Sequence, residues 1–188
     1  MLLIQFSGTQ STGKTTLSNS LSRQYDNSFV IGGIVRKLIS LGEVKSLPPF
    51  ESSDQLKIFL ELSYHFISDI LMGKKNIVFS ERTFVDMLAY SRYYLGKVSY
   101  IEDIAKRLID QTCFQNERFD ILTFYIPPVI PFMEDGIRDK HSFYDIDIII
   151  KDILKEFGVP YLRLDEILLE DRLKRVLEEV EKIRVLSK

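Results

Sequence analysis

The stretch GTQSTGKTT, residues 8–16, decides the fold expected for this chain. It contains a glycine, four further residues and then Gly-Lys-Thr, and it directly follows the apolar run 2–6. A helix-forming segment, 17–25, comes next. In a strand, loop and helix of this order, backbone N–H groups point at a bound phosphate near the positive end of the helix dipole. The stretch therefore predicts a phosphate-binding loop, the phosphate loop below, against the alternative of a Gly/Ser/Thr turn that matches by chance.

Individual residues of the phosphate loop have distinct expected roles. The glycines at 8 and 13 allow the tight turn. Lys14 is expected to reach the β- and γ-phosphates, and the Thr15 hydroxyl is expected to coordinate Mg²⁺. The residues expected to bind the nucleotide are Gly8, Ser11, Thr12, Gly13, Lys14, Thr15 and Thr16. The loop thus predicts a nucleoside triphosphate and Mg²⁺ as cofactors.

Length and composition describe an ordinary globular protein. The 188 residues fit one domain, residues 1–188, with 45% apolar and 28% charged residues. A net charge of -2 does not favour a dedicated nucleic-acid binder, although it leaves room for a local basic patch. Cys113 is the one cysteine, so no intrachain disulfide can form, and we expect it to be a buried thiol in a reducing compartment.

The sequence also bears on localisation. The chain begins in its first predicted strand, and no signal peptide precedes it. No apolar run approaches the ~18 residues needed to span a bilayer. We therefore expect a cytoplasmic protein with no membrane partner. Apolar side chains within 84–115 could form a homodimer face or simply the core.

Apolar segments alternate between strand and helix patterns along the chain. We expect strands at 2–6, 29–31, 77–79, 120–126 and 160–164, and helices at 16–25, 34–41, 54–72, 84–95, 100–115, 144–157 and 165–186. This order favours an α/β domain with a parallel sheet of about five strands flanked by helices. The irregular segment 42–53 is a substrate-side loop or a surface connection.

Polar residues follow the ends of the first three predicted strands, at the sheet edge where ligands gather in open α/β folds. After the third strand, Glu81 could hold Mg²⁺, directly or through water, or accept a proton from an attacking hydroxyl. The adjacent Arg82 could bind phosphate in a bidentate manner. A structural ion pair is the alternative for both residues.

Three further residues each have more than one interpretation. Arg36 either contacts an acceptor phosphate or sugar, or is a solvated helix arginine. Asp86 supports Arg82, contacts substrate, or is a surface helix charge. Arg138 lies in a lid-like loop around 131–142, which either closes over the transferred phosphoryl group and excludes water, or is a charged surface loop.

Together these motifs resemble the P-loop kinases of nucleosides and nucleotides, over residues 2 to about 164. Glu81-Arg82-Thr83 is similar to the Glu-Arg-Ser element of deoxyribonucleoside kinases and the Asp-Arg pair of thymidylate kinases. The stretch 32–36, GGIVR, is similar to the Gly-Asp-Leu-Leu-Arg stretch of nucleoside monophosphate kinases. The stretches 135–139 and 144–147 resemble the ribosylnicotinamide kinase branch, whose relatives are often described as AAA-type ATPase domains.

The resemblance implies the three-layer P-loop NTPase fold and transfer of the γ-phosphoryl group of Mg²⁺·ATP. The implied catalytic residues are Lys14, Glu81, Arg82 and Arg138, the implied metal-binding residues are Thr15 and Glu81, and the implied substrate-binding residues are Arg36, Arg82 and Asp86. The implied acceptor is a nucleoside or a (deoxy)nucleoside monophosphate, whose own phosphate Arg36 and Arg82 could bind. Nicotinamide riboside and a hydroxymethylated base within DNA stay open as acceptors.

Two other classes of function stay open beside the kinase. One is an ATPase without a small-molecule acceptor, although such proteins commonly place Asp-Glu, and not Ser80-Glu81, after a hydrophobic strand. The other is a non-catalytic nucleotide-binding module. Acceptor-dependent ADP release separates the kinase from the ATPase, and any turnover excludes the third class.

Overall fold

The computed structural model describes residues 1–45, 51–71, 76–114, 119–132 and 142–186. Its strands form one parallel sheet in the order β2-β3-β1-β4-β5. The strands are β1 (Leu2–Ser7), β2 (Ser28–Ile31), β3 (Ile77–Ser80), β4 (Asp120–Tyr125) and β5 (Leu162–Arg163). The helices are α1 (Lys14–Ser22), α2 (Ile34–Ser40), α3 (Ser52–His65), η1 (Phe66–Leu71), α4 (Phe84–Leu95), α5 (Ser99–Cys113), α6 (Ser142–Glu156) and α7 (Leu169–Leu186). The expected α/β fold with a five-stranded parallel sheet is confirmed.

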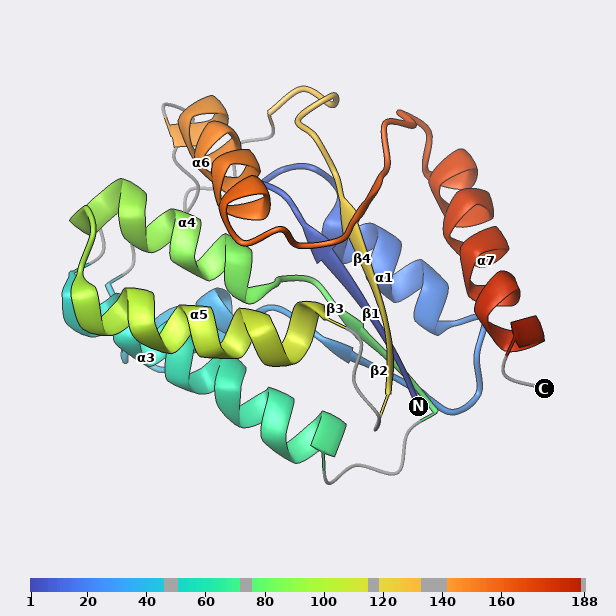
Figure 1. Ribbon diagram of the computed structural model, residues 1–188, viewed down its shortest axis with the longest axis horizontal. Coiled ribbons are helices and arrows are strands. Elements are labelled where there is room, and N and C mark those ends of the chain that lie inside the picture. The colour runs from blue at the N-terminus through green and yellow to red at the C-terminus, as the bar shows by residue number, and fades with distance from the viewer. Residues whose placement is uncertain (46–50, 72–75, 115–118, 133–141, 187–188) are drawn as a thin grey trace.

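Helices cover both faces of the sheet and make three layers (Figure 1). Helices α1 and α7 pack together on one face, where Leu17, Leu21 and Val176 join the core. Helices α3, α4, α5 and α6 cover the other face. All six residues of β1 are buried, which is why this central strand reads as a continuous apolar run and not as an alternating pattern.

The sheet places the predicted site residues at one edge. Strand β1 pairs with β3 from Leu2 opposite Ile77 to Gln5 opposite Ser80. Both strands therefore end side by side, and the phosphate loop follows one while Glu81 follows the other. Because β2 pairs with β3 in the same direction, the start of α2 reaches this edge as well. The crossover topology thus gathers residues far apart in the sequence.

Two predicted elements differ from the structure in detail. The expected helix 54–72 is α3 followed by the π-helical turn η1, which begins at Phe66. The expected strand 160–164 is paired only over Leu162–Arg163, since it lies at the sheet edge and meets only the end of β4. The chain then runs on to α7, which begins at Leu169 and not at 165.

Other predictions concern isolated residues. Cys113 is buried, its Sγ accepts a hydrogen bond from Gln5 Nε2 at 3.4 Å, and burial raises the pKa of the thiol to about 11. The prediction that Cys113 is a buried thiol is confirmed. His65, the last residue of α3, is hydrogen-bonded to Asp69 of η1, with 2.7 Å between Nδ1 and Oδ2. Of the helices in the described residues, none combines the length and apolar character that crossing a bilayer requires.

Candidate active site

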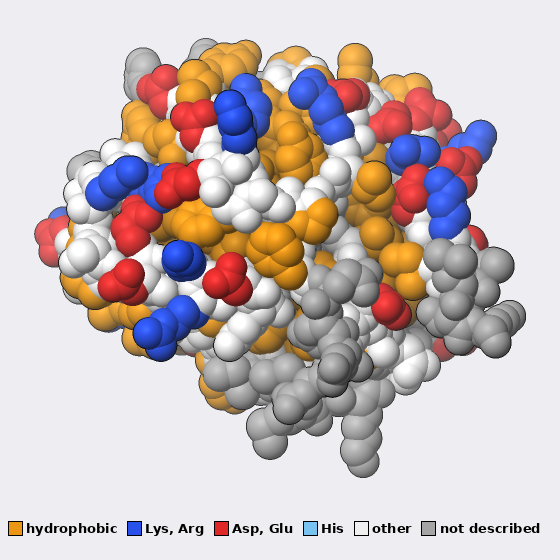
Figure 2. Space-filling view, in the orientation of Figure 1, with side chains coloured by type: hydrophobic (Ala, Val, Ile, Leu, Met, Phe, Trp, Pro, Cys, Tyr) orange, Lys and Arg blue, Asp and Glu red, His pale blue; other side chains and the backbone are white. Residues whose placement is uncertain are grey.

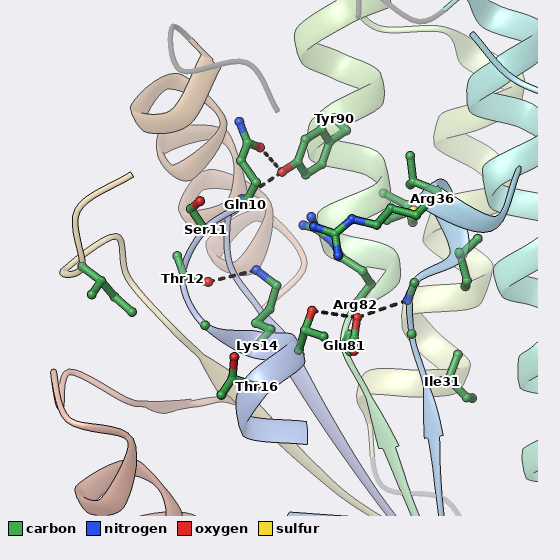
Figure 3. A pocket seen from close by; sticks show the side chains of 18 of the residues that line it. Gln10, Ser11, Thr12, Lys14, Thr16, Ile31, Arg36, Glu81, Arg82 and Tyr90 are labelled. Atoms are coloured by element: carbon green, nitrogen blue, oxygen red, sulfur yellow. Dashed lines mark hydrogen bonds between the residues drawn. The ribbon is translucent and has the colours of Figure 1, made fainter. Parts of the chain in front are cut away.

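A cavity of about 550 Å³ lies at the carboxyl edge of the sheet. The phosphate loop forms its floor, and side chains of α2, α3 and α4 line one half of it. The loops after β4 and β5 and the start of α7 line the other half. Figure 3 shows Arg36, Arg82 and Tyr90 on the first side of the loop and Thr16 on the second. The cavity therefore has two distinct halves joined by the phosphate loop.

The phosphate loop packs closely against the strand beside it. A Cβ on Gly8 would lie 2.4 Å from the carbonyl oxygen of Ile126, so no side chain fits there. Within the loop, the Thr12 hydroxyl donates to the carbonyl of Thr9 at 3.1 Å. Helix α1 begins directly at Lys14, which places its N-terminal amides at the cavity floor. This geometry suits an anion.

The Lys14 ammonium lies within the curve of the loop and lines the cavity. Its Nζ donates to the carbonyl of Gly8 at 2.7 Å and to the Thr12 hydroxyl at 2.9 Å, and it also bonds the carbonyl of Thr9. A cation held by the loop's own oxygens is positioned where phosphate oxygens would approach.

Glu81 and Thr15, the two residues expected to bind Mg²⁺, lie next to each other. The Glu81 carboxylate accepts hydrogen bonds from the Thr15 hydroxyl at 3.1 Å and from the Gly33 N–H at 3.2 Å. A Cβ on Gly32 would lie 2.2–2.6 Å from the carboxylate atoms, so the glycine makes room for Glu81. A hydroxyl and a carboxylate are oxygen donors of the kind that Mg²⁺ binds together with phosphate and water, so these residues fit the ion.

Arg82 also lines the cavity, and Gly8 and Tyr90 hold it in place. Its Nη1 donates to the carbonyl of Gly8 at 3.1 Å, and its Cζ lies 4.9 Å from the centre of the Tyr90 ring. Burial works against its charge, but Tyr90 and Asp86 outweigh this effect and raise the pKa of Arg82. Arg36 points into the same half of the cavity from α2 (Figure 3).

The structure corrects the interpretation of Asp86 as a surface charge. It is completely buried and is absent from the cavity wall, which excludes a surface charge and gives no support to a substrate contact. Its carboxylate instead accepts from the Ser7 hydroxyl at 2.7 Å, the Gly8 N–H at 3.0 Å and the Thr83 N–H at 3.2 Å. Burial raises its pKa, and the positive charges of Arg82 and Lys14 oppose that shift. Asp86 thus anchors α4 beneath the phosphate loop.

Sequence reasoning missed a bridge across the top of the site. The Gln10 N–H donates to the Tyr90 hydroxyl at 3.0 Å, and that hydroxyl donates in turn to Gln10 Oε1. Gln10 Nε2 donates to the hydroxyl of Ser142, the first residue of α6, at 3.1 Å. Gln10 occupies one of the four unspecified positions of the motif, so the pattern carried no signal for it.

Two other cavity residues were missed for similar reasons. Gln55 is buried on α3, in a stretch whose apolar spacing indicated only a packed helix. Arg172 is buried at the start of α7, in a stretch for which the sequence predicted only a helix. The spacing of residues within a helix cannot reveal which of its charged side chains another loop will cover. Arg138 and most of the expected lid lie outside the described residues.

A protein-family model described as an AAA domain matches residues 3–172. The chain belongs to this AAA-domain family. The match covers both halves of the cavity, from the phosphate loop to Arg172. The comparison with curated proteins finds no match.

Solved structures similar to this AAA-domain chain share its fold. Thymidylate kinase from Ehrlichia chaffeensis is 24% identical with a TM-score of 0.61, covering 95% of this chain and 98% of its own. The NadR protein in complex with NR is 22% identical with a TM-score of 0.72, covering 96% of this chain and 50% of its own. Deoxyadenosine kinase from M. mycoides is 11% identical with a TM-score of 0.61, and the match covers 96% of this chain and 99% of the kinase chain. At these identities the likeness shows that these proteins and this chain share one fold.

Proposed function

We propose that the chain is an ATP-dependent phosphotransferase that moves the γ-phosphoryl group of Mg²⁺·ATP to a nucleoside or a (deoxy)nucleoside monophosphate. The observation that carries the proposal is the hydrogen bond between Thr15 of the phosphate loop and Glu81, next to the cavity half that Arg36 and Arg82 line. This arrangement offers one site for a nucleotide and, next to it, one for a phosphoryl acceptor.

On the donor side, the amides at the start of α1 and the Lys14 ammonium would bind the β- and γ-phosphates. Thr15 and Glu81 would hold Mg²⁺, which neutralises charge on the phosphates when it is bound. Lys14 and Arg82, with Arg138 of the expected lid, would stabilise the equatorial oxygens of the transferred group. Glu81 also lies where it could accept the proton of an attacking hydroxyl, as an alternative to its role at the metal.

On the acceptor side, polar and apolar groups lie together. Gln55, Ile58, Met87, Tyr90 and Tyr94 line this half of the cavity beside the two arginines. Gln55 is buried, and its Nε2 has no hydrogen-bond partner among the described residues. Within the proposal, two guanidinium groups favour an acceptor that carries its own phosphate.

A modified base within DNA has weaker support as the acceptor. Arg92 pairs with Glu102 at 2.6 Å and with Glu156 at 2.7 Å, so it does not belong to a basic rim. On the face shown in Figure 2, positive and negative side chains are interspersed. A strand of DNA would call for a continuous positive surface with stacking groups.

The test is ADP release from Mg²⁺·ATP with nucleosides, (deoxy)nucleoside monophosphates, nicotinamide riboside and hydroxymethyluracil-bearing DNA as acceptors. We expect stimulation by one nucleoside or monophosphate class and loss of turnover in Lys14→Ala. With a monophosphate acceptor, Arg36→Met should raise the KM for the acceptor about tenfold or more and leave the KM for ATP unchanged. Lys37→Met is the matched control, because Lys37 pairs with Glu61 on the exterior.

The contradicting outcomes are equally specific. Steady ATP hydrolysis that no acceptor stimulates, and that Lys14→Ala abolishes, would favour the ATPase alternative. A nucleoside acceptor whose KM is insensitive to Arg36→Met would retain the kinase but remove the acceptor-phosphate role of Arg36.

A further inference from the structure

Arg172 connects the C-terminal helix α7 to the phosphate loop across 160 residues of sequence. The residue is only 2% exposed, which is rare for an arginine. Its Nη1 donates to the carbonyl of Thr12 at 2.6 Å, and its Nε donates to the carbonyl of Glu166, which precedes α7. A Cβ on Gly13 would lie 3.1 Å from Nη1. The guanidinium thus lies against the peptide bond between Thr12 and Gly13.

This peptide carries the carbonyl of Thr12 and the N–H of Gly13. Because a trans peptide is planar, its C=O and N–H point in opposite directions, so a contact that fixes the carbonyl also fixes the direction of the N–H. Gly13 has a φ of 86° and lines the cavity directly before α1, where a loop of this kind presents its amides to phosphate. A glycine has few conformational restraints of its own, so the orientation of this peptide depends on the contacts around it.

Two other carbonyls of the loop indicate what Arg172 prevents. The carbonyls of Gly8 and Thr9 both accept from Lys14 Nζ, the cation within the curve of the loop. The same ammonium lies 2.9 Å from the Thr12 hydroxyl, and it is therefore an alternative donor for the carbonyl of that residue (Figure 3). A Thr12 carbonyl turned toward Lys14 would point a negative oxygen at a bound phosphate and turn the Gly13 N–H away from it.

Burying a guanidinium for this contact has a cost. Burial lowers the pKa of Arg172, and the negative charge of Glu166 offsets this only in part. An apolar side chain of similar size often fills such a position with equal or greater stability. It would lack the charged donor, whose hydrogen bond to a carbonyl is stronger than that of a neutral group. Packing alone therefore does not account for an arginine here, whereas control of the Thr12 carbonyl does.

We propose that Arg172 is a positioning residue, which holds the Thr12 carbonyl toward α7 and thereby directs the Gly13 N–H at phosphate bound in the loop. Arg172 itself makes no contact with the ligand in this role. It therefore acts equally on every ligand that carries a phosphate chain, with or without a nucleoside. The inference rests on the proposed function only in taking the phosphate loop as the donor site.

The test follows the Gly13 N–H itself by NMR, without any acceptor. Thr12-Gly13 is the one Thr-Gly pair in the sequence, so labelling threonine with carbonyl ¹³C and glycine with ¹⁵N isolates a single amide signal. Saturating Mg²⁺·tripolyphosphate should move this proton downfield in the wild type, and Arg172→Met should lose the shift. Calorimetry should show tripolyphosphate and ATP binding weakened by one common factor, at least about tenfold. Without ligand, Arg172→Met should unfold at nearly the wild-type temperature.

Two further variants sharpen the test. Arg172→Lys keeps a charged donor for the Thr12 carbonyl, so it should retain the shift and bind both ligands within about threefold of the wild type. If the methionine variant does not fold, the lysine variant still tests the inference, because loss of its shift would contradict control of the carbonyl by a charged donor. Arg175→Met is the matched control and should change neither quantity, because Arg175 lies one helical turn further on and pairs with Glu179 at 3.2 Å.

Several results would overturn the inference. If the Gly13 shift survives in Arg172→Met while both ligands bind more weakly, Arg172 acts through its charge alone. Weaker binding of ATP without weaker binding of tripolyphosphate would also contradict a role on the phosphate chain, as would a wild-type Gly13 signal that does not respond to tripolyphosphate. A protein that shows the expected changes but phosphorylates no acceptor would refute the proposed function and retain this inference.

Discussion

At the scale of single residues, the site depends on the space that a glycine leaves for a carboxylate. The Glu81 carboxylate occupies the volume that a side chain on Gly32 would need, and it is fixed there by Thr15 and the Gly33 N–H. The position of this carboxylate is thus set in part by the loop between β2 and α2.

Replacing that glycine should therefore displace the carboxylate without touching the phosphate loop. In Gly32→Ala the new Cβ would overlap carboxylate atoms at 2.2–2.6 Å. We expect kcat to fall about 10–100-fold, since small displacements of a catalytic group have effects of this size, while the affinity for ATP stays within a few-fold. Steady-state kinetics over a range of Mg²⁺ concentrations measures both quantities.

The control for this substitution is Gly96→Ala. Gly96 has a φ of 73° and nothing within 4 Å of the added Cβ, so this change brings backbone strain without a collision. If Gly32→Ala keeps the wild-type kcat, the carboxylate can move without consequence, and Glu81 is not a catalytic group.

At the scale of elements, Arg92 joins three helices. Its guanidinium on α4 forms two hydrogen bonds with Glu102 of α5 and two with Glu156 of α6. The Glu102 bond is the largest contribution to the raised pKa of Arg92, and Arg92 in turn lowers the pKa of Glu156 from 4.5. The network holds α4 and α6 together. These helices carry Tyr90 and Ser142, which are hydrogen-bonded to Gln10 of the phosphate loop.

Removing this network should lower stability and leave the chemistry intact. We expect Arg92→Met to reduce the free energy of unfolding by about 1–2 kcal/mol, between the values for exposed and buried ion pairs. Because the folded pKa of Glu156 is lowered, its part of this stability is present above pH 4.5 and is lost as the pH falls through the folded pKa. Urea unfolding at several pH values measures the difference.

Arg107→Met, at an exposed position of α5, is the matched control and should change stability by less than about 0.5 kcal/mol. Equal effects of the two substitutions would mean that the ion pairs of Arg92 contribute nothing.

Contacts between elements also separate the parts of the site that the sequence predicts from those that it does not. The polar residues at the strand ends could be predicted from the sequence, because each apolar run and the motif that follows it, such as Gly-Lys-Thr, are adjacent in the chain. Gln10 with Ser142, and Thr12 with Arg172, are contacts across 132 and 160 residues. No local pattern contains such a contact, so the sequence did not predict Gln10, Ser142 or Arg172 as parts of the site.

At the scale of the whole molecule, the proposed donor site joins segments from both ends of the chain. The phosphate loop follows β1, while Arg172 belongs to α7, and α1 packs against α7 in the layer opposite α4. A ligand that contacts the loop and α7 together would favour the folded state over the unfolded chain, because the unfolded chain offers neither surface. Ligand binding and global stability should therefore be linked.

This linkage gives a prediction that requires no knowledge of the acceptor. At an ATP concentration of about 100 times Kd, with Mg²⁺ present, the folded state gains about 2.7 kcal/mol, which for a chain of this size raises Tm by roughly 5–10 °C. Differential scanning fluorimetry measures the shift, and Lys14→Ala should abolish it while keeping a comparable Tm without ligand. Tripolyphosphate, which lacks a nucleoside, should give a smaller shift at the same concentration. An equal shift from both ligands would mean that the stabilisation comes from the phosphate loop alone, and that α7 does not contact the ligand.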